Sequence, residues 1–122
     1  MSALIDGLHK TIDAALRRDR QAFLDSFTDD CEYVWHVGKR PLNGKEWLAK
    51  FLDRYWAEMA DNTWEIHRYA ENGNVLMAEG IETYVVKATG EKVVHPYMGV
   101  YEFRDGKIAK MRDYYDMGNG AT

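Results

Sequence analysis

The stretch that decides the fold is EKVVHPYMGVYEFRDGKIAKMRDYYDM, residues 91–117. β-Branched and aromatic residues flank an Arg-Asp-Gly tripeptide at 104–106, and an Asp-Gly pair in this setting indicates a hairpin because glycine takes the positive φ of the turn. The stretch therefore predicts two long strands. Three polar side chains, His95, Tyr97 and Asp113, interrupt the apolar pattern of these strands, so we expect the functional site there.

Length and composition predict a single domain over residues 1–122, long enough to bury roughly two-thirds of its unfolded surface. A hydrophobic fraction of 46% excludes a disordered chain, and no apolar run approaches the roughly 20 residues of a membrane span. The net charge of −4, with both signs interspersed, argues against nucleic acid and membrane as partners. The N-terminus lacks the pattern of a secretory signal, so we expect a cytoplasmic protein.

Apolar residues at three- and four-residue spacings predict a first helix over residues 2–17. Asp19 is expected to cap a short second helix, whose inner face carries Phe23, Leu24 and Phe27. The acidic residues 28–30 are expected to end this helix in a turn. A strand with no plainly polar face follows over residues 32–37.

Asn43 and Glu46 resemble a capping box, which predicts a third helix over residues 45–60 with a broad apolar face. Residues 63–70 and 75–87 read as strands joined by a hairpin turn at 71–74. Four strands in an antiparallel meander therefore follow the helices. This order predicts an α+β fold in which a curved sheet wraps around helices on one face and leaves a pocket.

Strand parity groups the polar residues of the pocket. If the turn at 104–106 is the three-residue type with glycine in a bulge, Tyr97 lies directly opposite Asp113 and His95 is one diagonal step away. A two-residue turn would shift the pairing by one residue and break this group. The preceding strand carries four residues of one parity: Ala78, Gly80, Glu82 and Tyr84.

The end of the chain, GVYEFRDGKIAKMRDYYDM, resembles the closing hairpin of the SnoaL-like branch of the nuclear transport factor 2-like superfamily. That branch includes polyketide cyclases, limonene-epoxide hydrolases and, more distantly, ketosteroid isomerase. The likeness covers essentially the whole chain. It implies a cone-shaped α+β domain with a deep apolar cavity, frequently dimeric through the outer face of the sheet. The scaffold hosts enzymes, binding proteins and association modules, so the resemblance alone does not fix a function.

The resemblance can be followed residue by residue to the functional positions of the cyclases and hydrolases. Asp113 matches the closing-strand aspartate that resembles the acid/base of the cyclases and hydrolases, and Tyr33 matches the hydrolase tyrosine that helps to hold the attacking water. Trp35 stands in place of the water-binding asparagine of the hydrolase, Gly80 in place of its arginine, and Glu82 in place of its second aspartate. We therefore expect no hydrolysis of limonene-type epoxides. His95 and Tyr97 occupy positions that are apolar in the hydrolase.

An aspartate inside an apolar cavity is disfavoured as a carboxylate, so its pKa rises unless it is partnered, which suits a general acid or base near neutrality. The alternative for Asp113 is a surface salt bridge to Arg68 or Arg112. His95 either orients Asp113, shuttles a proton or is a structural imidazole. Tyr97 either donates to a developing oxyanion or packs in the sheet.

Other positions leave similar alternatives open. Tyr33 is either an oxyanion donor or sheet packing. Glu82 shares protons with Asp113, pairs with His95 or is a charge at a strand edge. The lone Cys31 excludes an internal disulfide, and dispersed histidines form no recognisable ligand set, so we predict no metal and no cofactor.

The sequence thus predicts a protein that binds a small, largely apolar organic molecule and performs cofactor-independent isomerisation or aldol-type cyclisation through Asp113. His95 and Tyr97 are the further catalytic candidates. The ligand-binding candidates are Tyr33, Trp35, Glu82, Tyr84 and Met111. The alternatives are a non-catalytic ligand-binding or dimerisation module and hydrolase-like activation of water.

A homodimer is expected from the outer face of the sheet, where an apolar patch would otherwise be exposed. The patch is predicted to contain Tyr69, Val100, Tyr101, Arg112 and Tyr114.

Overall fold

The computed structural model describes residues 3–115, and the structural statements below refer to this part of the chain. The helices are α1 (Ala3–Arg17), α2 (Arg20–Asp25) and α3 (Lys45–Glu58). The strands are β1 (Phe27–Val34), β2 (Leu42–Asn43), β3 (Met59–Asn72), β4 (Val75–Val86), β5 (Lys92–Arg104) and β6 (Lys107–Tyr115). They form one sheet in the order β2-β1-β6-β5-β4-β3.

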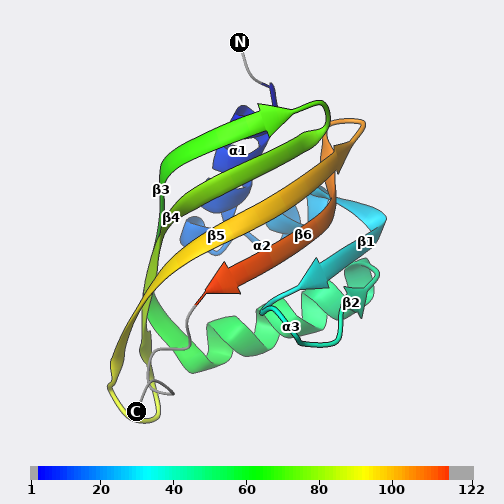
Figure 1. Cartoon of the computed structure of the whole chain (residues 1–122). Helices are drawn as coiled ribbons and strands as arrows, with labels where there is room; N and C mark the ends of the chain where they lie inside the picture. Colours follow the sequence, from blue (N-terminus) through cyan, green and yellow to red (C-terminus); the bar gives the residue numbers. More distant parts are fainter. Residues whose placement is uncertain (1–2, 116–122) are drawn as a thin grey trace.

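The sheet is mostly antiparallel and curves around the helices, as predicted. Strands β3 to β6 form the expected meander, whereas β1 lies beside β6 in parallel. Figure 1 shows α1 and α2 behind the sheet and α3 across its lower end. The predicted α+β fold, with an open curved sheet over helices, is confirmed. None of the helices in the described part of the chain is long and apolar enough to cross a membrane.

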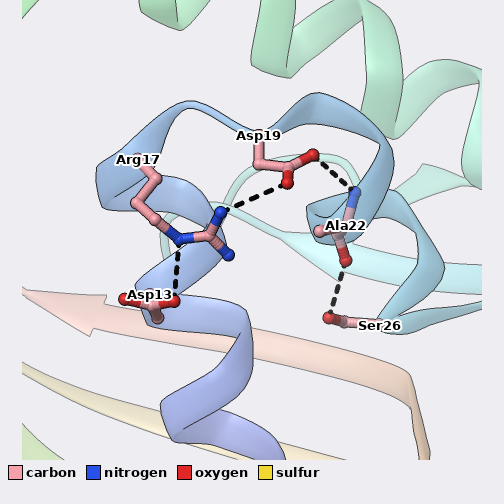
Figure 2. A network of polar contacts seen from close by, with 5 residues as sticks. All are labelled: Asp13, Arg17, Asp19, Ala22 and Ser26. Atoms are coloured by element: carbon pink, nitrogen blue, oxygen red, sulfur yellow. Dashed lines mark hydrogen bonds and ion pairs between the residues drawn. The ribbon is translucent and has the colours of Figure 1, made fainter.

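The corner between α1 and α2 is fixed by polar side chains. Asp19 caps α2 as predicted, because its carboxylate accepts a hydrogen bond from the Ala22 amide at 3.1 Å. Arg17 connects Asp13 to Asp19 across the corner (Figure 2). This network holds the end of α1 close to the start of α2.

The first strand differs from the prediction. β1 begins at Phe27, so this residue belongs to the strand and the expected turn at 28–30 is strand as well. The acidic side chains are tolerated because both point to water, and cations lie beside them: Lys45 pairs with Asp29, and Arg104 pairs with Asp30. β1 also ends at Val34, three residues earlier than expected.

The predicted capping box of the third helix is wrong. The N-cap of α3 is Gly44, at φ 95° and without a side-chain cap. Asn43 is held in β2, where it pairs with Glu32. The backbone of Asn43 is therefore committed to the sheet. The helix ends at Glu58 because β3 begins at the next residue.

The closing hairpin has a two-residue turn, not the three-residue turn on which the predicted register depended. Asp105 and Gly106 both have positive φ, 54° and 79°, and Arg104 pairs with Lys107. Such a turn matches the twist of the flanking strands.

A bulge beyond Phe103 then shifts the register by one more residue. As a result Gly99 lies opposite Asp113, and Tyr97 lies opposite Tyr115. The predicted direct pairing of Tyr97 with Asp113 is wrong. Both side chains still face the same side of the sheet, because the turn and the bulge together displace the register by two residues and a displacement of two preserves the face.

A second bulge, in β3, changes which side chains face the helices. The register shifts between Ile66 and Arg68, so Arg68 lies opposite Glu79 and Tyr69 lies opposite Ala78. Position 80 is glycine for a physical reason: a Cβ there would overlap the Glu65 carbonyl oxygen and lie 2.8 Å from its carbonyl carbon. The two backbones approach each other too closely for any other residue.

The core lies between the helices and the inner face of the sheet. Tyr101 belongs to it, with 0% exposure, so its predicted place in the outer patch is wrong. Tyr69, opposite Ala78, does not belong to the outer face either. Val100, Arg112 and Tyr114 lie on the outer face as predicted. The exposed apolar side chains there are Tyr114 and three residues that were not predicted, Met77, Val94 and Met98.

Candidate functional site

A pocket of about 450 Å³ lies between α3 and the inner face of the sheet, within the range of small-molecule sites. Its wall is mainly aromatic and carries two carboxyl groups, from Asp113 on β6 and Glu82 on β4. Every residue that the sequence put forward for catalysis or binding lines this pocket. These residues are Tyr33, Trp35, Glu82, Tyr84, His95, Tyr97, Met111 and Asp113.

Asp113 reaches the pocket from the middle of β6. Tyr33 on β1 donates a hydrogen bond to its Oδ2 at 3.0 Å, while its Oδ1 is buried and has no partner among the described residues. Burial, and after it the nearby charge of Glu82, raise the pKa of Asp113 to about 8, although the Tyr33 hydrogen bond acts in the opposite direction. The surface salt bridge considered for Asp113 is not formed, because Arg68 pairs with Glu79 and Arg112 with Glu102.

Glu82 faces the same pocket from β4. It lies opposite His95 in the register, but its carboxylate accepts a hydrogen bond from Tyr55 of α3, at 3.0 Å from Oη to Oε2. Burial raises the pKa of Glu82 as well, and the Tyr55 hydrogen bond opposes this effect. Tyr55 in turn accepts a hydrogen bond from Asn62 Nδ2 at 2.9 Å.

The two carboxyl groups are electrostatically coupled. Each is poorly solvated inside the aromatic pocket, and the negative charge of Glu82 raises the pKa of Asp113. Two carboxyl groups in such surroundings lose their protons one after the other, because the first charge disfavours the second. With a pKa of about 8, Asp113 therefore keeps its proton near neutral pH.

The other two catalytic candidates are held by neighbours. His95 is 4% exposed, and its Nε2 is hydrogen-bonded to Tyr84 Oη at 3.0 Å. The hydroxyl of Tyr97 accepts a hydrogen bond from the indole N–H of Trp64 and lies 3.5 Å from the hydroxyl of Tyr101. Burial raises the pKa of Tyr97 above the range of neutral pH, so this hydroxyl keeps its proton.

The pocket is also lined by residues with polar atoms that the sequence did not put forward: Arg54, Tyr55, Trp56, Glu58, Asn62, Thr63, Trp64 and Tyr115. Tyr55 and Trp64 fit apolar patterns that indicate packing, although both carry a polar tip that needs a partner when buried. Asn62 follows the end of α3, where no periodic pattern marks a side chain. The described residues contain no group of three or more His, Cys, Asp or Glu that would hold a metal ion.

The curved sheet over helices, with a pocket between them, is the fold of solved NTF2-like proteins. The model of the SnoaL-like domain family matches residues 8–111, and the chain belongs to this family.

Solved structures show the same fold. An LEH-like epoxide hydrolase from M. tuberculosis is 24% identical, with a TM-score of 0.82 over 93% of this chain and 83% of the other. An NTF2-like protein from Burkholderia pseudomallei is 16% identical, with a TM-score of 0.87 over 98% and 95%. TerC, co-crystallised with polyporic acid, is 19% identical, with a TM-score of 0.81 over 94% and 92%.

Proposed function

We propose that the chain binds a small, largely apolar carbonyl compound in the pocket and catalyses its isomerisation or aldol-type cyclisation by proton transfer, without a cofactor. The observation that carries the proposal is the pair of coupled carboxyl groups, Asp113 and Glu82, in one aromatic pocket. A carboxyl group with a pKa of about 8 can act as an acid at neutral pH, which an ordinary aspartate cannot.

The chemistry needs one group that takes a proton and one that gives a proton. The ionised carboxylate removes a proton from the carbon next to the carbonyl, and the protonated carboxyl group donates its proton to the carbonyl oxygen. The product of this step is an enol, and the pair has exchanged its proton. Return of a proton to a different carbon gives the isomer, and attack of the enol on a second carbonyl gives the cyclised product.

His95 and Tyr97 support this step in the proposal. Both lie on β5 between the two carboxyl-bearing strands, and both line the pocket. Tyr97, whose hydroxyl accepts a hydrogen bond from Trp64, donates a hydrogen bond to the carbonyl oxygen of the substrate as negative charge develops there. His95 holds Tyr84 at the wall beside Glu82.

Proton exchange tests the proposal without knowledge of the natural substrate. Cyclohexenone and tetralone are incubated with the protein in deuterated buffer, and the loss of the hydrogen next to the carbonyl is followed by proton NMR. We expect exchange faster than in buffer alone. Binding of either ketone, seen as quenching of the pocket tryptophans, without any exchange would instead support the non-catalytic binding module.

We expect no hydrolysis of limonene oxide or cyclohexene oxide. As the resemblance implies, that reaction needs an arginine that keeps two carboxyl groups in opposite protonation states, and Gly80 occupies its position with no room for a side chain. Trp35 also lines the pocket where the hydrolase binds its water. Diol formation measured by gas chromatography should equal that of buffer. Diol formation that depends on the protein and is lost in Asp113→Asn would place the chain among the hydrolases.

We further propose a homodimer through the outer face of the sheet. Met77, Val94, Met98 and Tyr114 are each 40% to 52% exposed there, on three adjacent strands. A cluster of this kind is typical of an association surface. Light scattering at micromolar concentration should give twice the mass of the chain, and Met98→Glu should reduce it to one chain. A monomeric mass for the unchanged protein would contradict the proposal.

A further inference from the structure

Arg18 has a backbone conformation that arginine rarely adopts. It lies just after α1 at φ 58°, where the Asp19 amide donates to Ala14 at 2.9 Å and the Arg18 amide donates to Ala15 at 3.1 Å. This hydrogen-bond pattern is a Schellman ending, in which the left-handed position is usually glycine. A residue with a Cβ costs on the order of 1 kcal/mol there. A strained residue persists where the surrounding structure holds it, so its side chain is the place to look for a role.

The guanidinium of Arg18 joins the end of α3 to the start of β3. It donates to the carbonyl oxygens of Trp56 at 2.8 Å and Met59 at 2.7 Å, and to Asn62 Oδ1 at 3.1 Å. The backbone on which Arg18 sits is itself fixed by the Asp19 network of Figure 2. Arg18 therefore presents a fixed donor to Asn62.

The Arg18 guanidinium determines the direction of the two hydrogen bonds that connect Asn62 to Tyr55 and Tyr55 to Glu82. A guanidinium can only donate, so the atom of Asn62 facing it is the oxygen, and the amide nitrogen faces Tyr55. Asn62 Nδ2 donates to Tyr55 Oη at 2.9 Å, so the hydroxyl proton of Tyr55 points to its other partner, Glu82 Oε2, at 3.0 Å. Glu82 must therefore offer a lone pair and not a proton at this oxygen.

We propose that Arg18 is a positioning residue, which acts through Asn62 and Tyr55 to make Glu82 the proton acceptor of the pocket and to leave the proton of the pair on Asp113. This inference rests on the proposed function and assigns the two roles within it. Glu82 removes the proton from carbon as a carboxylate, and Asp113 gives its carboxyl proton to the carbonyl oxygen.

The other titratable groups around Glu82 do not determine which of the two carboxyl groups holds the proton. The titratable and charged residues that face the pocket from the packed elements are Tyr33 of β1, Arg54, Tyr55 and Glu58 of α3, Tyr84 of β4, His95 and Tyr97 of β5, and Asp113 and Tyr115 of β6. Arg54 is 80% exposed and pairs with Glu58, so it is screened by water. Tyr55 donates a hydrogen bond to the Glu82 carboxylate, and the direction of this hydrogen bond is set from Arg18.

The titration order of the two carboxyl groups tests the inference independently of activity. Carbon-13 NMR of protein labelled at the Asp and Glu carboxyl carbons follows both groups from pH 4 to pH 10, with Asp113→Asn and Glu82→Gln assigning the signals. In the unchanged protein Glu82 should lose its proton before Asp113. In Asn62→Leu the midpoint of Glu82 should rise by about one pH unit, since the Tyr55 hydroxyl can then accept a hydrogen bond from the protonated Glu82 carboxyl group.

Arg18→Gly provides a second variant that is expected to fold, because glycine adopts the left-handed conformation without strain. It should move the Glu82 midpoint in the same direction as Asn62→Leu. Arg20→Met is the matched control: it removes an arginine that pairs with Asp53 in the same region and is not connected to Asn62. In Arg20→Met, Glu82 should titrate as in the unchanged protein. The inference would be overturned if the Glu82 midpoint stayed unchanged in both Asn62→Leu and Arg18→Gly. It would also be overturned if Asp113 lost its proton before Glu82 in the unchanged protein.

Ketone exchange separates this inference from the proposed function. Where the unchanged protein exchanges ketone hydrogens, Arg18→Gly, outside the pocket lining, should slow exchange about tenfold and move its pH profile to higher pH, with ketone binding unchanged. Absence of exchange in the unchanged protein refutes the proposed function, while the titration order still decides whether Arg18 sets the protonation of Glu82.

Discussion

Asp113→Asn should abolish proton transfer and at the same time stabilise the fold at neutral pH. The amide of asparagine has no acidic proton to give, so ketone exchange should fall by a factor on the order of 10² to 10⁴. Asparagine has nearly the shape of aspartate and still accepts the hydrogen bond that Tyr33 donates to Oδ2. We therefore expect ketone binding and the fold to persist.

The gain in stability follows from the direction of the pKa shift. The pKa of Asp113 rises from 3.8 to about 8 on folding, because burial and then the charge of Glu82 disfavour the carboxylate. The folded state thus binds the proton more tightly than the unfolded state, so the free energy of unfolding falls as the pH rises from about 4 to about 8. Asparagine has no such dependence, and its advantage should grow to a few kcal/mol across this window.

Urea unfolding at pH 5 and pH 8.5 measures this difference. The midpoint of Asp113→Asn should exceed that of the unchanged protein by more at pH 8.5 than at pH 5. Glu102→Gln is the control, because this carboxylate lies on the neighbouring strand and is satisfied by Arg112. It should leave ketone exchange unchanged. Full exchange activity in Asp113→Asn, or a stability difference that shrinks with rising pH, would contradict the assignment of Asp113 as a buried acid.

Gly80→Ala should severely destabilise the protein. The added methyl group would overlap the Glu65 carbonyl oxygen and lie 3.1 Å from the Ile66 Cα, and all of these are backbone atoms of β3. Relief requires β3 to move away from β4, which breaks ladder hydrogen bonds on both sides of the bulge. We expect a loss of about 3 kcal/mol or more, the upper end of the range for overpacking.

Thermal and urea unfolding followed by circular dichroism measure this loss. Glu79→Ala, one residue away, is the matched control, since its side chain is 48% exposed and forms a surface ion pair with Arg68. It should change the free energy of unfolding by less than about 1 kcal/mol. A Gly80→Ala protein that unfolds at the same midpoint as Glu79→Ala would show that β3 and β4 do not approach as closely as described.

The contents of the pocket could be predicted from sequence even though the register could not. An Asp-Gly pair indicates a turn but not its length, and the bulge beyond Phe103 has no sequence signature. The turn and the bulge happen to compensate, so Tyr97 and Asp113 stay on one face. A register error of two residues leaves every side chain on its predicted face of the sheet, whereas an error of one residue moves every side chain to the other face.

Other features depend on partners distant in the chain, which local patterns do not reveal. Asp29 and Asp30 resemble a turn because acidic residues are unusual in strands, and the cations that stabilise them, Lys45 and Arg104, come from other elements. The same holds for the Tyr55 hydroxyl. Its partners, Glu82 and Asn62, become visible only when α3 is placed against the sheet.

The position of β6 in the sheet bears on how the chain reaches its folded state. β6 lies between β1 and β5, and Phe27 of β1 finds its partner Ile108 only at the far end of the sequence described. Until β6 arrives, β1 and β2 form a short ribbon with an open edge, and β5 exposes another. Contacts so remote along the chain form slowly, and open strand edges pair readily with those of other molecules. The yield of refolding should therefore depend on dilution, because the last strand to join the sheet competes with neighbouring chains for the same two edges.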